Sequence, residues 1–97
     1  MRVQLQYVQD CPNAPVADER LRRALDAVGL DDVTVQHVLV SEPTGFHGSP
    51  TILIDDVDPF PGEPVGQSCR LYRNDQGLAG APTQAQLVSA LRSRSRG

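Results

Sequence analysis

Residues 3–28 constrain this chain most, because an alternating strand pattern there meets a turn and then a helical pattern. Val3, Leu5 and Tyr7 alternate with two glutamines, which is the period-two signature of a half-buried strand. Turn-forming residues follow at positions 10–13. The apolar positions of the next segment recur three and four residues apart, as on one face of a helix: Ala17, Leu21, Ala24, Leu25 and Val28. Gly29 is the expected helix stop.

Cys11 lies in the turn between this strand and this helix. A thiol at the start of a helix is close to unpaired backbone N–H groups, which favour the reactive thiolate. Pro12 suits a first helical position and would make Cys11 the N-cap. Pro15 instead disfavours helix at Ala14 and lets Asn13 compete as the cap. If Asn13 is the cap, the helix dipole acts more weakly on Cys11.

The length of 97 residues and the ordinary share of apolar residues, 39%, predict one globular domain. The net charge is −3 and all nine basic residues are arginine, so we expect no nucleic-acid partner. The arginines of residues 92–97 are expected in a frayed helix end. We find no membrane-spanning run and no signal-peptide pattern, and the two cysteines fit a reducing, cytoplasmic compartment.

Three further strands and a second helix are expected after the first helix. The strand patterns cover residues 33–40, 51–55 and 69–73, with a Pro/Gly-rich loop over residues 56–68. Thr83 and Gln86 form a capping box ahead of the second helix. The first strand, helix and second strand read as a right-handed βαβ unit with parallel strands.

This order predicts an α/β, two-layer fold with a four-stranded mixed sheet (βαβ-ββα) and two helices on one face. Gln4 and Gln6 fit the opposite, open face of that sheet. The open face is a candidate surface for a homodimer, although a solvated sheet face is the commoner outcome.

These residues resemble the thioredoxin-like superfamily, in a minimal glutaredoxin-like form. The resemblance rests on the strand that ends in residues 11–14 at the mouth of a helix, and on residues 48–51 leading into an apolar strand. It implies a thioredoxin-like fold, a cis peptide bond between Ser49 and Pro50, and a position for Pro50 across from Cys11. Ala14 stands where a dithiol member has its second cysteine, so the motif is a monothiol one. Leu5 stands where thioredoxins have a buried acid.

The remaining candidate residues each have a structural alternative. Ser49 can bond the sulfur of Cys11 or be a plain turn residue, and His47 can exchange a proton with a thiol or be an exposed loop histidine. His37 is in phase with the second strand and is expected to have a hydrogen-bond partner there. Cys69, at the start of the fourth strand, is expected at the sheet end away from Cys11, which favours a structural thiol over a resolving one, and a long loop folded back would be needed to bring the two together. No zinc-site spacing is present.

We therefore predict thiol-disulfide exchange through Cys11, with Ser49 and Pro50 as the other site residues. The partner would be a disulfide-containing protein or glutathione, and glutathione would be a co-substrate with no other cofactor. Two alternatives stay open. One is a non-catalytic binding module that has lost its second cysteine, and the other is a thiol that binds mercury or another soft metal.

Overall fold

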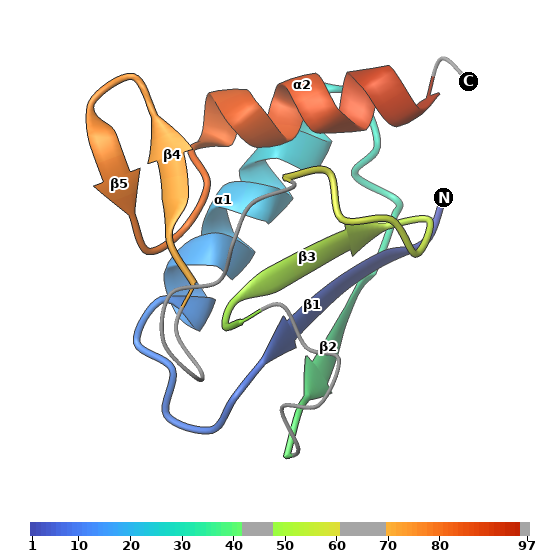
Figure 1. Ribbon diagram of the computed structural model, residues 1–97. Coiled ribbons are helices and arrows are strands. Elements are labelled where there is room, and N and C mark those ends of the chain that lie inside the picture. Colours follow the sequence, from blue (N-terminus) through green and yellow to red (C-terminus); the bar gives the residue numbers. More distant parts are fainter. Residues whose placement is uncertain (42–47, 61–69, 96–97) are drawn as a thin grey trace.

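The computed structural model describes residues 1–41, 48–60 and 70–95. Its elements in chain order are β1 (Val3–Tyr7), α1 (Ala14–Ala27), β2 (Val35–Leu39), β3 (Thr51–Ile54), β4 (Tyr72–Asn74), β5 (Gly77–Ala79) and α2 (Gln84–Ser95). Figure 1 shows both helices on the same side of the strands β1, β2 and β3. The helix α2 extends to Ser95, so residues 92–95, which we had expected in a frayed end, are helical.

The strands form two sheets. β1 is the central strand of a three-stranded sheet with the order β2-β1-β3, parallel to β2 and antiparallel to β3. β4 and β5 form a separate antiparallel pair. The βαβ unit is therefore confirmed. The predicted four-stranded, thioredoxin-like sheet is wrong, because no fourth strand joins β3 in the described part of the chain.

Two turns explain why β3 gains no fourth strand. Asp55 and Asp56 have positive φ angles of 51° and 67°, and the turn they make brings Val57 back to exchange two backbone hydrogen bonds with Ile54. The segment that we expected to pair with β3 makes its own hairpin instead. There the side chain of Asn74 accepts a hydrogen bond from the backbone N–H of Gln76 at 2.7 Å, and Gly77 supplies a φ of 120°.

The core lies between the helices and one face of the three-stranded sheet. Because side chains alternate along a strand, Val3 and Leu5 of β1 face the same way as their β3 partners Ile54 and Ile52. All four are at most 1% exposed. They pack in one cluster with buried residues of both helices, which are Ala17, Leu21, Ala24, Leu25, Leu87 and Leu91. On the opposite sheet face, the side chains of Gln4 and Gln36 are joined by a 3.3 Å hydrogen bond.

Local sequence signals set both ends of α1 and the start of α2. Asn13 is the N-cap of α1, and Gly29, at a φ of 78°, ends the helix as predicted. The backbone N–H of Leu30 bonds the carbonyl of Leu25 at 2.8 Å, which is the Schellman pattern. The predicted capping box is confirmed, since Thr83 and Gln86 each donate a backbone N–H to the other's side chain.

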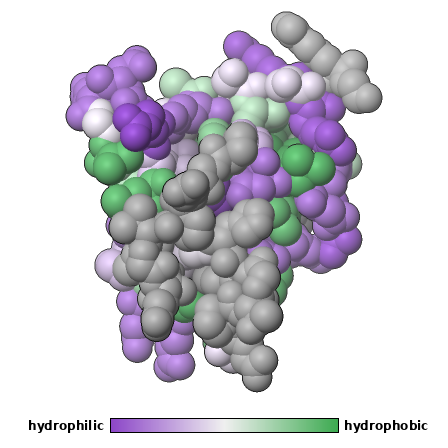
Figure 2. All heavy atoms as spheres, viewed as in Figure 1, coloured by the Kyte–Doolittle hydropathy of each residue, from purple (hydrophilic) through white to green (hydrophobic). Residues whose placement is uncertain are grey.

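The described part of the chain contains no helix with the length and apolar character needed to cross a membrane. On the face seen in Figure 2, hydrophobic side chains show as separate patches among hydrophilic ones. The large exposed hydrophobic residues come from different segments: Met1, Val16, Leu39, Val57, Leu71 and Leu78.

Candidate functional site

Cys11 is partly exposed, forms no disulfide, and lies in the turn between β1 and α1. Its backbone N–H bonds the carbonyl of Val8 at 3.3 Å, and Asp10 adopts a positive φ of 62° within this turn. Because Asn13 is the N-cap, Cys11 precedes the first helical residue by three positions. The helix start therefore acts on the thiol less strongly than it would if Cys11 were the cap.

The segment leading into β3 lies beside the end of β1. The Ser49–Pro50 peptide bond is cis, as the resemblance implied. Ser49 is buried, and its hydroxyl oxygen accepts a hydrogen bond from the backbone N–H of Val8 at 3.1 Å. Ser49 thus holds the start of β3 against the chain three residues before Cys11. The hydroxyl oxygen of Ser49 accepts its hydrogen bond from the backbone of Val8, whereas we had considered a hydrogen bond between this hydroxyl and the sulfur of Cys11.

Tyr72 of β4 binds this segment. It is 3% exposed, and its hydroxyl donates a hydrogen bond to the carbonyl of Pro50. Burial raises the pKa of Tyr72 far above its ordinary value; the Arg70 guanidinium opposes the rise, while the charges of Asp58 and Cys11 add to it. The effect of the Cys11 charge on Tyr72 places the two residues in the same region of the molecule. The Tyr72 side chain stays neutral and donates its hydroxyl proton to Pro50.

A buried ion pair lies behind Tyr72. Arg70 is 3% exposed and binds both carboxylate oxygens of Asp58, at 2.7 and 3.2 Å. The Arg70 guanidinium also donates to Thr51 and to the carbonyl of Phe60, and it lies 4.5 Å from the centre of the Tyr72 ring. The Phe60 ring meets the Tyr72 ring edge to face, with centroids 5.6 Å apart. These contacts fix the orientation of the phenol.

The start of α1 is held from a further direction, by the connection between β5 and α2. A Cβ atom on Gly80 would lie 2.3 Å from the side-chain nitrogen of Asn13, so any other residue at position 80 would force this side chain to move. Arg20 of α1 donates to the carbonyl of Pro82 at 3.1 Å. Residues distant in sequence therefore support the turn that carries Cys11.

Of the predicted site, the structure joins Ser49 to Val8, three residues before Cys11, and joins Pro50 to Tyr72. His47 and Cys69 lie outside the described residues. Arg70, the residue after Cys69, is not where we expected it. Its backbone N–H donates to the carbonyl of Ser49 at 3.1 Å. This contact is at the start of β3, whereas a simple hairpin would have placed the segment at the end of β3, away from Cys11.

His37 lies on β2 and has a hydrogen-bond partner, as we predicted without naming one. Its Nε2 lies 2.7 Å from Oδ1 of Asp18, on α1. Among the described residues, no three histidine, cysteine, aspartate or glutamate side chains converge as metal ligands do.

Sequence reasoning missed Tyr72, Arg70 and Asp58. Asp58 fell within the predicted loop over residues 56–68, and we had assigned no role to the two others. The predicted strand over residues 69–73 contained a signal for this cluster. Arg70 and Tyr72 are two residues apart and therefore point the same way in an extended chain. If Tyr72 is buried, Arg70 on the same face is drawn toward the interior with it, and a buried arginine requires an acid.

Comparisons with protein-family models, with curated proteins and with solved structures found no match for this chain.

Proposed function

We propose that Cys11 performs monothiol exchange with disulfides, including glutathione mixed disulfides. The observation that supports this most is the surroundings of the thiol. Cys11 is partly exposed and has no disulfide partner, the nearby Val8 is bonded to the buried Ser49, and Tyr72 holds the adjoining Pro50. A thiol that only fills a core needs neither exposure nor a polar neighbour.

The reaction balances without an external oxidant. The thiolate of Cys11 attacks one sulfur of a disulfide, forms a mixed disulfide with it, and releases the other sulfur as a thiolate that takes up a proton. A second thiol then attacks the mixed disulfide and restores Cys11. Because Ala14 replaces a second cysteine in the motif, this thiol must come from glutathione, a protein partner or Cys69.

We also propose membership of the thioredoxin-like superfamily, supported by two sequence motifs and not by the sheet. Residues 11–14 and 48–51 carry the resemblance, and the hydrogen bond between Ser49 and Val8 joins the second motif to the chain just before the first. A reducing, cytoplasmic setting suits a function that depends on a free thiol.

Oxidised glutathione tests the proposal directly. Intact-mass spectrometry should show one glutathione added to the wild-type protein and its removal by reduced glutathione. Cys11→Ser should abolish the addition, and Cys69→Ser is the matched control that should retain it. If wild-type Cys11 stays unmodified, the non-catalytic binding module is the better interpretation. If only Cys69→Ser abolishes the addition, the assignment of the active thiol is wrong.

The homodimer through the open sheet face also stays a prediction. The exposed Gln36 and the partly buried Val38 and Leu53 lie on that face. Sedimentation at increasing concentration should show a dimer that Val38→Arg disrupts. A wild-type monomer at all concentrations would exclude it.

A further inference from the structure

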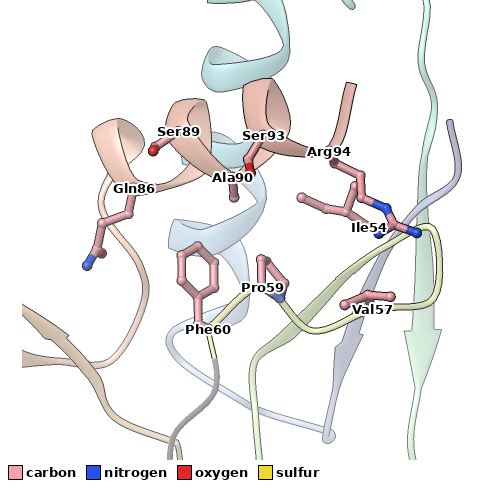
Figure 3. A pocket seen from close by; sticks show the side chains of 9 residues that line it. All are labelled: Ile54, Val57, Pro59, Phe60, Gln86, Ser89, Ala90, Ser93 and Arg94. Atoms are coloured by element: carbon pink, nitrogen blue, oxygen red, sulfur yellow. The ribbon is translucent and has the colours of Figure 1, made fainter. Parts of the chain in front are cut away.

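A pocket of about 510 Å³ lies between α2 and the chain that follows β3, which is within the size range of small-molecule sites (Figure 3). Its lower wall in this view is apolar and consists of Ile54, Val57, Pro59 and Phe60. Its upper wall is the α2 surface formed by Gln86, Ser89, Ala90, Ser93 and Arg94. We call this cavity the α2 pocket.

Small side chains on α2 leave the pocket open. Ala90 projects toward the space between Phe60 and Pro59, while Ser89 and Ser93 lie one helical turn apart along the wall. No large apolar side chain of α2 covers the opposite wall, and Val57 is 47% exposed. The pocket therefore offers apolar surface that an apolar ligand group can cover.

The polar groups of the α2 pocket differ in their availability. Gln86 is fully engaged, since its oxygen accepts from Thr83 and its nitrogen donates to the carbonyl of Arg73. Arg94 has one contact, from Nε to Oδ2 of Asp55 at 3.4 Å. Within the described residues, its two terminal nitrogens have no partner, and neither do the hydroxyls of Ser89 and Ser93.

Asp55 is engaged through both of its carboxylate oxygens. Its Oδ1 accepts the backbone N–H of Arg2 at 2.9 Å, and its Oδ2 faces Arg94. The hydrogen bond from Arg2 lowers the pKa of Asp55, so this carboxylate stays ionised and holds Arg94 at the pocket. The charged groups still available to a ligand are therefore the two terminal nitrogens of Arg94, which are hydrogen-bond donors on a cation. Such donors favour an anionic ligand.

We propose that the α2 pocket binds a small organic carboxylate, with its apolar body on Phe60 and Pro59 and its carboxylate on the terminal nitrogens of Arg94. Ser93, next to Arg94, can donate a further hydrogen bond to the carboxylate. This inference is independent of the proposed thiol chemistry, because none of the pocket residues contacts Cys11 in the described structure.

Phenylacetate and its neutral analogue phenylacetamide test this proposal, with ¹⁵N–¹H correlation spectra as the readout. Phenylacetate should cause saturable shifts at α2 and at residues 57–60, and phenylacetamide should bind at least about tenfold more weakly because it lacks the charge. Arg94→Gln should weaken phenylacetate binding by a similar factor. Arg92→Gln removes the same charge from the same helix and should leave the affinity within about twofold.

Filling the pocket provides a test that does not depend on charge. Ala90→Leu should abolish the shifts, and Ser93→Leu gives a second blocking variant at an exposed position if Ala90→Leu disturbs the fold. Three results would overturn the proposal: no saturable shifts with millimolar phenylacetate, equal affinity for phenylacetamide, or equal losses in Arg94→Gln and Arg92→Gln.

Discussion

The guanidinium of Arg70 binds both carboxylate oxygens of Asp58, at 2.7 and 3.2 Å, and both side chains are at most 10% exposed. This ion pair joins the chain after β3 to the chain before β4. It also holds the guanidinium against the ring of Tyr72, whose hydroxyl is bonded to the carbonyl of Pro50.

Asp58→Asn should be strongly destabilising, because it leaves the buried Arg70 charge without its counter-ion. We expect the free energy of unfolding in urea to fall by about 3 kcal/mol. The exposed pair of Arg2 and Asp56, 3.3 Å apart, provides the control, and Asp56→Asn should cost less than about 1 kcal/mol. Similar losses in the two variants would show that the Arg70–Asp58 pair is not buried as described.

Tyr72 should make stability fall at alkaline pH. Its pKa in the folded protein is raised by burial, so the unfolded chain loses the phenol proton first, from a pH of about 10. The stability from the neutral phenol is complete below that pH and is lost as the pH rises toward the folded pKa. We expect a loss of about 1.4 kcal/mol per pH unit in this window.

Urea unfolding across the alkaline range measures this effect. Tyr72→Phe should flatten the pH dependence and, at neutral pH, cost about 1 kcal/mol through the lost bond to Pro50. Tyr7→Phe removes the other tyrosine and should keep the steep dependence. A wild-type stability that is constant up to pH of about 11 would contradict the burial of Tyr72.

The turn after β3 should tolerate only residues that accept a positive φ. Asp56 has a φ of 67°, so Asp56→Val should destabilise the protein by about 1–2 kcal/mol more than Asp56→Asn does. Both variants remove the charge, and asparagine accepts this conformation. Thermal unfolding of the two variants measures the difference, and equal stabilities would show that the turn is not of this type.

Sequence reasoning succeeded where the signal was local. The alternation of Val3, Leu5 and Tyr7 predicted β1, the spacing of the apolar residues predicted α1, and the capping box at Thr83 predicted the start of α2. Each of these signals depends on residues within a few positions of one another. Two prolines had left the N-cap of α1 open between Cys11 and Asn13, and only the structure identified Asn13 as the cap.

The errors concerned which strands pair and which charges meet. The residues from Asn74 to Gly77 contain a turn signal that we did not weigh, so we paired the fourth strand with β3 instead of with β5. Asp58 and Arg70 meet across a long loop, and no periodicity predicts such a contact. The missed side chains at the candidate site therefore come from the region where pairing was predicted wrongly.

The rate at which Cys11 reacts with oxidised glutathione, in the folded protein and in urea, tests the central proposal most directly. Cys69→Ser, in which Cys11 is the remaining cysteine, isolates this rate. If the fold makes Cys11 a functional thiol, the folded protein should react at least about tenfold faster than the unfolded chain at the same pH, after correction for the effect of urea on the exchange reaction itself. A folded protein that reacts more slowly than its unfolded chain would contradict the proposal.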